Sequence, residues 1–206
     1  MKRLFVGSAV FVTIAALTVW VAFGTGHSSG GAVRSTAAEQ GAPQQRHGSE
    51  RVEELLRSVG IQPFSGPQTR IDFELPDLTE RMRSLEDYRG RMVFLNFWAT
   101  WCPPCIEEMP SMQRLADELR DHGLVVVAVN VQEDRSTVEP FVDDLGLTFE
   151  ILLDRRGRTG QSYGVRGLPT TVLLDREGEV MATKLGFAIW DAPEMIDALR
   201  TLLREY

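Results

Sequence analysis

Two cysteines are the residues of this 206-residue chain best suited to chemistry, and both lie in the run Trp101-Cys102-Pro103-Pro104-Cys105. A C-x-x-C pair can be half of a zinc site, a haem attachment site or a redox dithiol. A closed zinc site needs a second ligand pair, which is missing because the three histidines (His27, His47 and His122) fall in expected linker or helix-end segments. Haem attachment needs a histidine after the second cysteine, where the chain has Ile106. The spacing therefore favours a redox pair, and we expect neither a metal nor another cofactor.

The segments around the motif predict the role of each cysteine. The nearly continuous apolar run 92–98 predicts a strand buried on both faces of a sheet, and a helix is expected to begin at about Pro103. At that helix N-terminus the first sulfur should be exposed, facing unpaired N–H groups and the positive end of the helix dipole, which lower its pKa. We therefore expect Cys102 to be the attacking thiolate. Cys105 follows one turn later and can resolve a mixed disulfide.

Both residues between the cysteines are proline, so neither can donate a backbone N–H to the Cys102 thiolate. A thiolate with fewer donors is less stabilised, and a less stabilised reduced form makes a poorer oxidant. We therefore predict a moderately to strongly reducing couple.

The N-terminus predicts export. Lys2 and Arg3 precede a charge-free stretch over residues 4–23, long enough to span a hydrocarbon core of about 30 Å. Basic residues before the apolar stretch place the N-terminus in the cytoplasm. We therefore expect a single-pass membrane anchor over residues 1–24, with everything after it on the extracytoplasmic side. A cleaved signal peptide is the alternative, because Ala22-Phe23-Gly24 is an acceptable small-x-small cleavage site.

Residues 25–61 are expected to form a flexible tether with a short helix. Residues 25–50 are rich in Gly, Ser, Ala and Gln, a composition that buries too little apolar surface to offset its ordering entropy. Residues 50–59 then space four apolar side chains along one helical face, and Gly60 ends it. The net charge of -7 without a Lys/Arg-rich run gives no footprint for nucleic acid.

Residues 62–206 have the pattern of a single α/β domain. Strands are expected at 71–75, 82–85, 92–98, 124–131, 149–153, 170–174 and 179–185, and helices at 103–121, 133–145 and about 191–203. Pro140 is expected to break or kink the second helix, and Asp191-Ala192-Pro193-Glu194 reads as a capping box that opens the third. Alternating strands and helices with a terminal hairpin predict a mixed central sheet flanked by helices.

Three motifs in matching order carry a family resemblance over residues 62–206. They are the run 96–110 around the cysteines, the run Gly167-Leu168-Pro169-Thr170-Thr171, and the run Phe73-Glu74-Leu75-Pro76-Asp77. Together they closely resemble the membrane-anchored TlpA/ResA-like branch of the thioredoxin superfamily. The resemblance implies a thioredoxin fold with an N-terminal β-hairpin and an inserted β-α unit, which residues 124–146 would supply.

The resemblance also implies site residues. Pro169 matches a cis-proline that faces the disulfide and leaves the backbone of Leu168 free to pair with a substrate strand. Trp101, before the first cysteine, matches a partly exposed contact residue, and Pro104 is counted with these positioning residues. Phe97 and Trp98 are expected in the core.

The proton-handling residues differ from those of ordinary thioredoxins. The position of the buried aspartate beneath the second cysteine is Asn96 here, and an amide cannot accept the proton. The acidic residue that the TlpA/ResA-like branch holds near the sulfurs matches Glu108, one turn beyond Cys105, which we interpret as a proton relay or substrate-selecting acid. The alternative is a solvated first-turn glutamate, as Glu107 should be. Glu133 matches another acidic position near the site.

The expected activity is that of a reductase that passes electrons from a membrane thiol donor to exported disulfide-containing proteins. By family analogy the target is often an apocytochrome c or a copper-site assembly protein. General extracytoplasmic disulfide reduction or isomerisation is the alternative. A peroxidase would need Thr-x-x-Cys, and Thr100 lies only two residues before Cys102. A copper chaperone would need C-x-x-x-C and a later histidine, and none follows His122.

Overall fold

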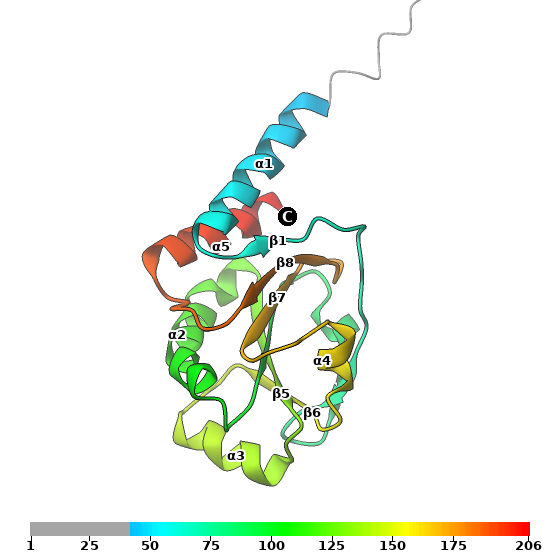
Figure 1. Cartoon of the computed structure of the whole chain (residues 1–206), viewed down its shortest axis with the longest axis vertical. Coiled ribbons are helices and arrows are strands. Elements are labelled where there is room, and N and C mark those ends of the chain that lie inside the picture. Colours follow the sequence, from blue (N-terminus) through cyan, green and yellow to red (C-terminus); the bar gives the residue numbers. More distant parts are fainter. Residues whose placement is uncertain (1–41) are drawn as a thin grey trace, which may run out of the picture. The chain divides into compact units, whose positions relative to one another are not determined.

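The computed structural model describes residues 42–206, which form a mixed sheet covered by helices (Figure 1). The expected membrane anchor at 1–24, and the tether up to residue 41, lie outside these residues. Over the described range, none of the helices combines the length and the apolar character that a membrane crossing needs.

The elements follow one another as a βαβ series that ends in a hairpin and a helix. The helices are α1 (Ala42–Ser58), α2 (Pro103–Leu119), α3 (Arg135–Asp144), α4 (Arg158–Ser162) and α5 (Pro193–Glu205), with short 3-10 turns η1 (Leu85–Tyr88) and η2 (Arg120–His122). The strands are β1 (Gln62–Pro63), β2 (Glu74–Pro76), β3 (Met82–Ser84), β4 (Met92–Trp98), β5 (Leu124–Val131), β6 (Glu150–Asp154), β7 (Thr170–Leu174) and β8 (Val180–Leu185).

The main sheet has the strand order β1-β8-β7-β4-β5-β6. β4, β5 and β6 run parallel, whereas β7 is antiparallel to β4 and β8 is antiparallel to β7. β2 and β3 form a separate antiparallel hairpin. Two β-α units, β5-α3 and β6-α4, separate α2 from the loop before β7. This arrangement confirms the predicted thioredoxin fold with its N-terminal hairpin and additional β-α unit.

β4 is the centre of the sheet and is buried along its whole length, as its continuous apolar sequence predicts. Because side chains alternate along a strand, Phe94 and Trp98 pack in the core under the helices. Leu95 and Phe97 pack in a second core that includes Leu75 of β2. Asn96 falls on the helix side, which places an amide beneath α2.

The predicted bounds of β4, β5 and β7 are confirmed, whereas the helix ends differ. α3 begins at Arg135 and continues through Pro140, so of the two expected effects, a break or a kink, the break does not occur. The expected capping box is also wrong, because α5 is capped at Ala192 without a side-chain hydrogen bond. The carboxylate of Asp191 accepts a hydrogen bond from the Arg114 guanidinium instead.

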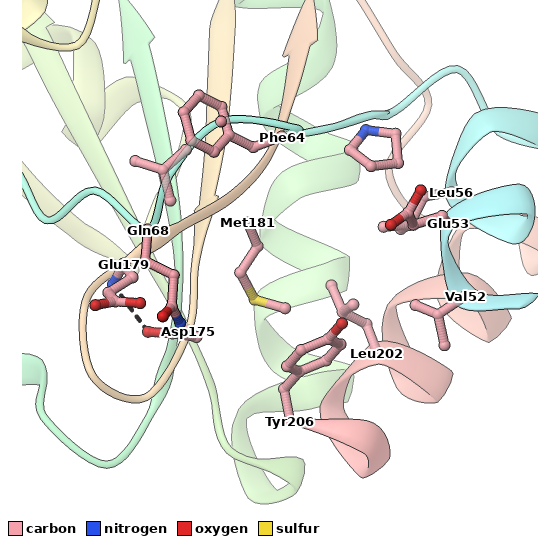
Figure 2. A pocket seen from close by; sticks show the side chains of 13 residues that line it. Val52, Glu53, Leu56, Phe64, Gln68, Asp175, Glu179, Met181, Leu202 and Tyr206 are labelled. Atoms are coloured by element: carbon pink, nitrogen blue, oxygen red, sulfur yellow. Dashed lines mark hydrogen bonds between the residues drawn. The ribbon is translucent and has the colours of Figure 1, made fainter. Parts of the chain in front are cut away.

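α1 begins at Ala42, earlier than the apolar spacing from residue 50 predicts. Its C-terminal half packs beside α5, and Val52 and Leu56 are buried there. Figure 2 shows the hollow that these two side chains line together with Leu202 of α5 and Tyr206, the residue after α5. Neither cysteine lines this hollow, so α1 serves packing there rather than the redox motif.

Candidate active site

Cys102 and Cys105 are joined by a disulfide at the start of α2, with their Cα atoms 5.3 Å apart. Cys102 is the N-cap of the helix and has extended backbone angles (φ -98, ψ 100). The motif therefore lies just after β4, at the N-terminus of a helix, as the sequence predicts.

The first turn of α2 leaves no spare backbone donor for the Cys102 sulfur among its first four residues. Pro103 and Pro104 occupy positions N1 and N2 and have no N–H. The N–H groups of Cys105 and Ile106 both donate to the carbonyl oxygen of Cys102, at 3.1 Å each. A thiolate at Cys102 would be stabilised by the helix dipole but would receive no hydrogen bond from this turn.

Cys102 is less exposed than its expected role suggests. In the disulfide form it keeps 4% of its surface, against 0% for Cys105. Access is nevertheless confined to Cys102, which lines a surface hollow together with Trp101, Pro104 and Leu168. The relative order of exposure agrees with Cys102 as the attacking and Cys105 as the resolving residue.

The loop before β7 faces the motif across this hollow. The Leu168–Pro169 peptide bond is cis, as the resemblance implies. The backbone N–H and C=O of Leu168 have no hydrogen-bond partner within residues 42–206. The N–H of Gly186 donates to the carbonyl of Pro169 at 2.8 Å, which ties the loop after β8 to this site.

Exposed apolar side chains border the hollow on the side of Trp101 and Gly167. Trp101 is 66% exposed, as its expected contact role requires, whereas Phe97 and Trp98 are fully buried. Leu185, the last residue of β8, is also exposed and lies near Gly167 of the hollow. The loop tied to Pro169 carries two further exposed apolar side chains, Phe187 and Ile189. Exposed apolar side chains beside a reactive sulfur, as at Trp101, are typical of a surface that contacts another polypeptide.

Glu108 lies in the protein interior, with 1% of its surface exposed. This burial overturns the alternative of a solvated first-turn glutamate, whereas Glu107 is exposed as expected. One carboxylate oxygen accepts from Asn96 Nδ2 at 2.8 Å. The other accepts from the Ala188 N–H at 3.2 Å and from Trp190 Nε1 at 3.1 Å.

Burial raises the pKa of Glu108 to about 7, although hydrogen bonds from Asn96, Trp190 and Ala188 and the charge of Lys184 pull it down. A carboxyl group with such a pKa can release or take up a proton near neutral pH. It lies on α2 one turn beyond Cys105, on the same face of the helix.

Asn96 links Glu108 to the sheet. Its Nδ2 also donates to Thr171 Oγ1 at 3.0 Å, directly across the β4–β7 pairing. Its carbonyl oxygen is buried without a partner among the described residues. An acceptor is therefore still available beside the carboxyl group.

Glu133 acts on the approach to the motif rather than at the sulfurs. One of its carboxylate oxygens accepts from the Thr100 N–H and from Asn130 Nδ2, both at 2.7 Å. The other accepts from the Thr100 hydroxyl. Glu133 therefore clamps the residues that connect β4 to Cys102.

Sequence reasoning missed the partners of Glu108 that come from the segment after β8. Trp190 and Ala188 lie about eighty residues further along the chain, so local spacing carries no sign of them. Thr171 lies in the quoted proline motif and could have been noticed there. Lys184, whose Nζ donates to the carbonyls of Leu185 and Phe187, has no sequence signal.

Comparison with known proteins agrees with this geometry. The model of the AhpC/TSA family matches residues 68–183. The protein named thiol-disulfide oxidoreductase ResA of Geobacillus thermodenitrificans is 49% identical over 112 residues, which make up 54% of this chain and 64% of that protein. The chain thus spans less than two thirds of the length of that relative.

Two solved structures are similar over most of their own length. The exposed lipoprotein thioredoxin Etrx1 of Streptococcus pneumoniae is 30% identical with a TM-score of 0.54, covering 66% of this chain and 100% of that one. The secreted thiol-disulfide isomerase of Corynebacterium glutamicum is 27% identical with a TM-score of 0.59, covering 69% and 88%. Both similarities extend over the domain that carries the two cysteines.

Proposed function

The chain belongs to the AhpC/TSA family and to its ResA-like members, and from that premise we propose that it is a thiol–disulfide oxidoreductase that reduces disulfides of exported proteins. One observation carries the proposal. The Cys102–Cys105 pair opens α2 and shares a hollow with Leu168, whose backbone has no partner among the described residues.

The reaction proceeds through a mixed disulfide. In the dithiol form, the Cys102 thiolate attacks one sulfur of the substrate disulfide, and the other substrate sulfur leaves as a thiolate that takes up a proton. Cys105 then loses its proton and attacks the Cys102 sulfur. The Cys102–Cys105 disulfide forms and the second substrate thiolate leaves, so two electrons pass from the protein to the substrate. A dithiol donor must restore the reduced pair.

Glu108 is proposed as the group that handles the proton of Cys105. It is buried one turn along the same helix face and has a pKa near neutrality, which suits a proton acceptor for a resolving thiol. With this pKa, both the protonated and the ionised form of Glu108 exist near neutral pH. Glu108 can therefore also return the proton to Cys105 when the pair is reduced again. An unchanged pH profile of Cys105 reactivity in Glu108→Gln would remove this role.

The direction of the reaction follows from the first turn of α2. Two prolines and two occupied N–H groups leave the Cys102 thiolate without a donor from this turn, which disfavours the reduced form. A couple of this kind gives electrons readily. We therefore propose reduction rather than oxidation of substrates.

The proposed site of action is the extracytoplasmic side of the cytoplasmic membrane. The apolar stretch over residues 4–23 after Lys2 and Arg3 supports an anchor. The names of the two similar structures, one secreted and one exposed, support export of this chain as well. A membrane thiol reductant is the proposed donor, and apocytochrome c or a copper-site assembly protein is the proposed substrate.

Trapping tests the proposed function. A Cys105→Ala variant, produced as the full chain in a bacterium with the export route, should accumulate mixed disulfides on Cys102 that mass spectrometry can identify. The Cys102→Ala variant is the matched control and should trap almost nothing, because Cys105 is fully buried. Absence of any protein adduct on Cys102 would contradict the proposal. Adducts with many unrelated proteins would favour general reduction or isomerisation over a dedicated client.

A further inference from the structure

A groove leads away from Cys102 along the surface towards α4. The hollow beside Cys102 adjoins a second hollow, and both are lined by Val131, Gln132, Val165 and Arg166. The second hollow is also lined by Gly157, Gly160, Gln161 and Gly164. We call the combined surface the α4 groove. It is continuous with the reactive cysteine, so whatever occupies it must lie next to the bond that is exchanged.

Glycines keep part of the α4 groove open. A Cβ atom at Gly157 would lie 3.1 Å from Gln132 Cγ, and the φ of +66° at this residue disfavours a side chain as well. At Gly164, with φ +69°, a Cβ atom would meet nothing within 4 Å and would project into open space. Missing side chains let another backbone approach closely.

Gln132 supplies a polar group to the α4 groove. It has a φ of 62°, a conformation that costs a non-glycine residue of order 1–3 kcal/mol. The N–H of Gln132 donates to the carbonyl of Asp154 at 3.0 Å, which helps to fix this conformation. Its exposed side-chain amide has no hydrogen-bond partner within residues 42–206 and can bond a peptide group.

Arg166 is the charged residue of the α4 groove. The other residues that line its two hollows are uncharged. Within the described part of the chain, Arg166 has no ion-pair partner, although the whole protein carries a net charge of -7. An unpaired guanidinium beside the nucleophile attracts an anionic group.

We propose that the α4 groove binds the extended polypeptide segment that flanks the reactive cysteine of the substrate, and that Arg166 selects an acidic side chain in this segment. The inference rests on the proposed function and adds the class of substrate sequence. The amide of Gln132 bonds the backbone of the segment, and the unpartnered backbone of Leu168 bonds it closer to the cysteine. The cysteine itself forms the mixed disulfide with Cys102.

Synthetic peptides test this selection. Each peptide carries one cysteine joined by a disulfide to neutral 2-mercaptoethanol, and two residues placed three and four positions from the cysteine are both Glu, both Gln or both Lys. A mirrored set carries them on the other side. The reduced full-length protein should release the thiol of the Glu peptide about threefold faster than that of the Gln peptide on one side of the cysteine, and the Lys peptide more slowly. The advantage should shrink in 0.5 M salt.

Charge reversal identifies the residue responsible. Arg166→Glu should invert the preference, so that the Lys peptide reacts fastest. Arg51→Glu makes the same change on the exposed part of α1, outside the groove, and should keep the preference of the wild-type protein. Gln132→Gly removes the side-chain amide, and glycine tolerates the positive φ at this position. This variant should reduce all three peptides about fivefold more slowly, because each loses one hydrogen bond.

The outcomes separate this inference from the proposed function. Equal rates for the three peptides in both sets, with efficient reduction of each, would overturn the inference and leave the oxidoreductase activity intact. A preference that Arg51→Glu abolishes as fully as Arg166→Glu would also overturn it. Failure to reduce any peptide or a small aromatic disulfide would contradict the proposed function itself, and the inference with it.

Discussion

The carboxyl group of Glu108 is held between two opposing effects. Burial favours its neutral form, whereas three hydrogen-bond donors and the charge of Lys184 favour the carboxylate. Burial is the larger effect and raises the pKa to about 7. Near neutral pH the group can therefore exist in either form, which a fully solvated glutamate could not.

This balance predicts how stability depends on pH. Because the folded pKa lies above the value of 4.5 expected for an unperturbed glutamate, protonated Glu108 favours the folded state below about pH 4.5. That contribution is lost as the pH rises through about 7. Relative to Glu108→Gln, the free energy of unfolding of the wild-type protein should fall by about 3 kcal/mol between pH 4 and pH 8. Urea unfolding of the oxidised proteins measures it, because the disulfide does not titrate.

Glutamine fits this site if Asn96 turns its amide, so that the unpartnered carbonyl oxygen meets the new NH₂ group. The matched control is Glu107→Gln, the same chemical change on the exposed side of α2. Parallel stability curves for the wild-type protein and Glu108→Gln over pH 4–8 would contradict the raised pKa.

The prolines of the motif predict a shift in potential. An N-cap side chain accepts from the N–H at N2 or N3, and the residue at N2 is Pro104. Pro104→Ala restores this donor, stabilises the Cys102 thiolate and so makes the couple more oxidising, by about 30 mV for one charge-assisted hydrogen bond. Titration in dithiol–disulfide buffers measures the midpoint. Pro103→Ala restores only the N–H at N1 and should shift it less; equal shifts would contradict the explanation.

At the scale of elements, the motif depends on the short connection between β4 and α2. Glu133, just after β5, holds this connection through Thr100, and the parallel pairing of β4 with β5 brings the two together. The helix N-terminus is thereby fixed relative to the sheet, and the cysteine pair relative to the Leu168–Pro169 loop.

Removal of the clamp should therefore cost stability. Glu133→Ala leaves the Thr100 N–H and hydroxyl and the Asn130 amide without their acceptor, and the free energy of unfolding should fall by about 3 kcal/mol. Asp134→Ala is the matched control: its exposed carboxylate lies 3.6 Å from Arg155, and its loss should cost less than about 1 kcal/mol. Equal losses in urea unfolding would show that Glu133 is no clamp.

The elements that the sequence predicts best are those whose burial is uniform. β4, β5 and β7 are runs of apolar β-formers, so their bounds could be read directly. The early start of α1 could not, because residues 42–49 lack an apolar face to reveal a helix. The predicted capping box of α5 was wrong for a different reason. The carboxylate of Asp191 accepts a hydrogen bond from Arg114 on α2 instead of capping the helix.

At the scale of the whole molecule, the candidate site is assembled from three separated segments. The cysteines and Glu108 could be identified from their motif, and Pro169 from its own. The burial of Glu108 could not, because it is produced by Ala188 and Trp190 after β8, which topology alone brings beneath α2. The α4 groove likewise joins segments after β5 and after α4 that no local pattern connects.

Weaker packing of α1 should lower the stability of the domain without changing the redox potential of the Cys102–Cys105 pair. Leu56 is buried between α1 and the rest of the helix-side core, in the hollow that neither cysteine lines. Leu56→Ala should lower the free energy of unfolding by about 3 kcal/mol through lost apolar contact and a cavity. The midpoint potential reports only the difference between the oxidised and reduced folded forms, so it should stay unchanged if both lose the same contact.

Unfolding in urea and redox titration of the same preparation check both halves of this expectation. Leu55→Ala is the matched control, because its side chain is only half-buried and should cost less. A shift of the potential together with the loss of stability in Leu56→Ala would mean that α1 packs differently in the two redox forms. In that case the helix that leads out of the N-terminal region would be coupled to the chemistry of Cys102.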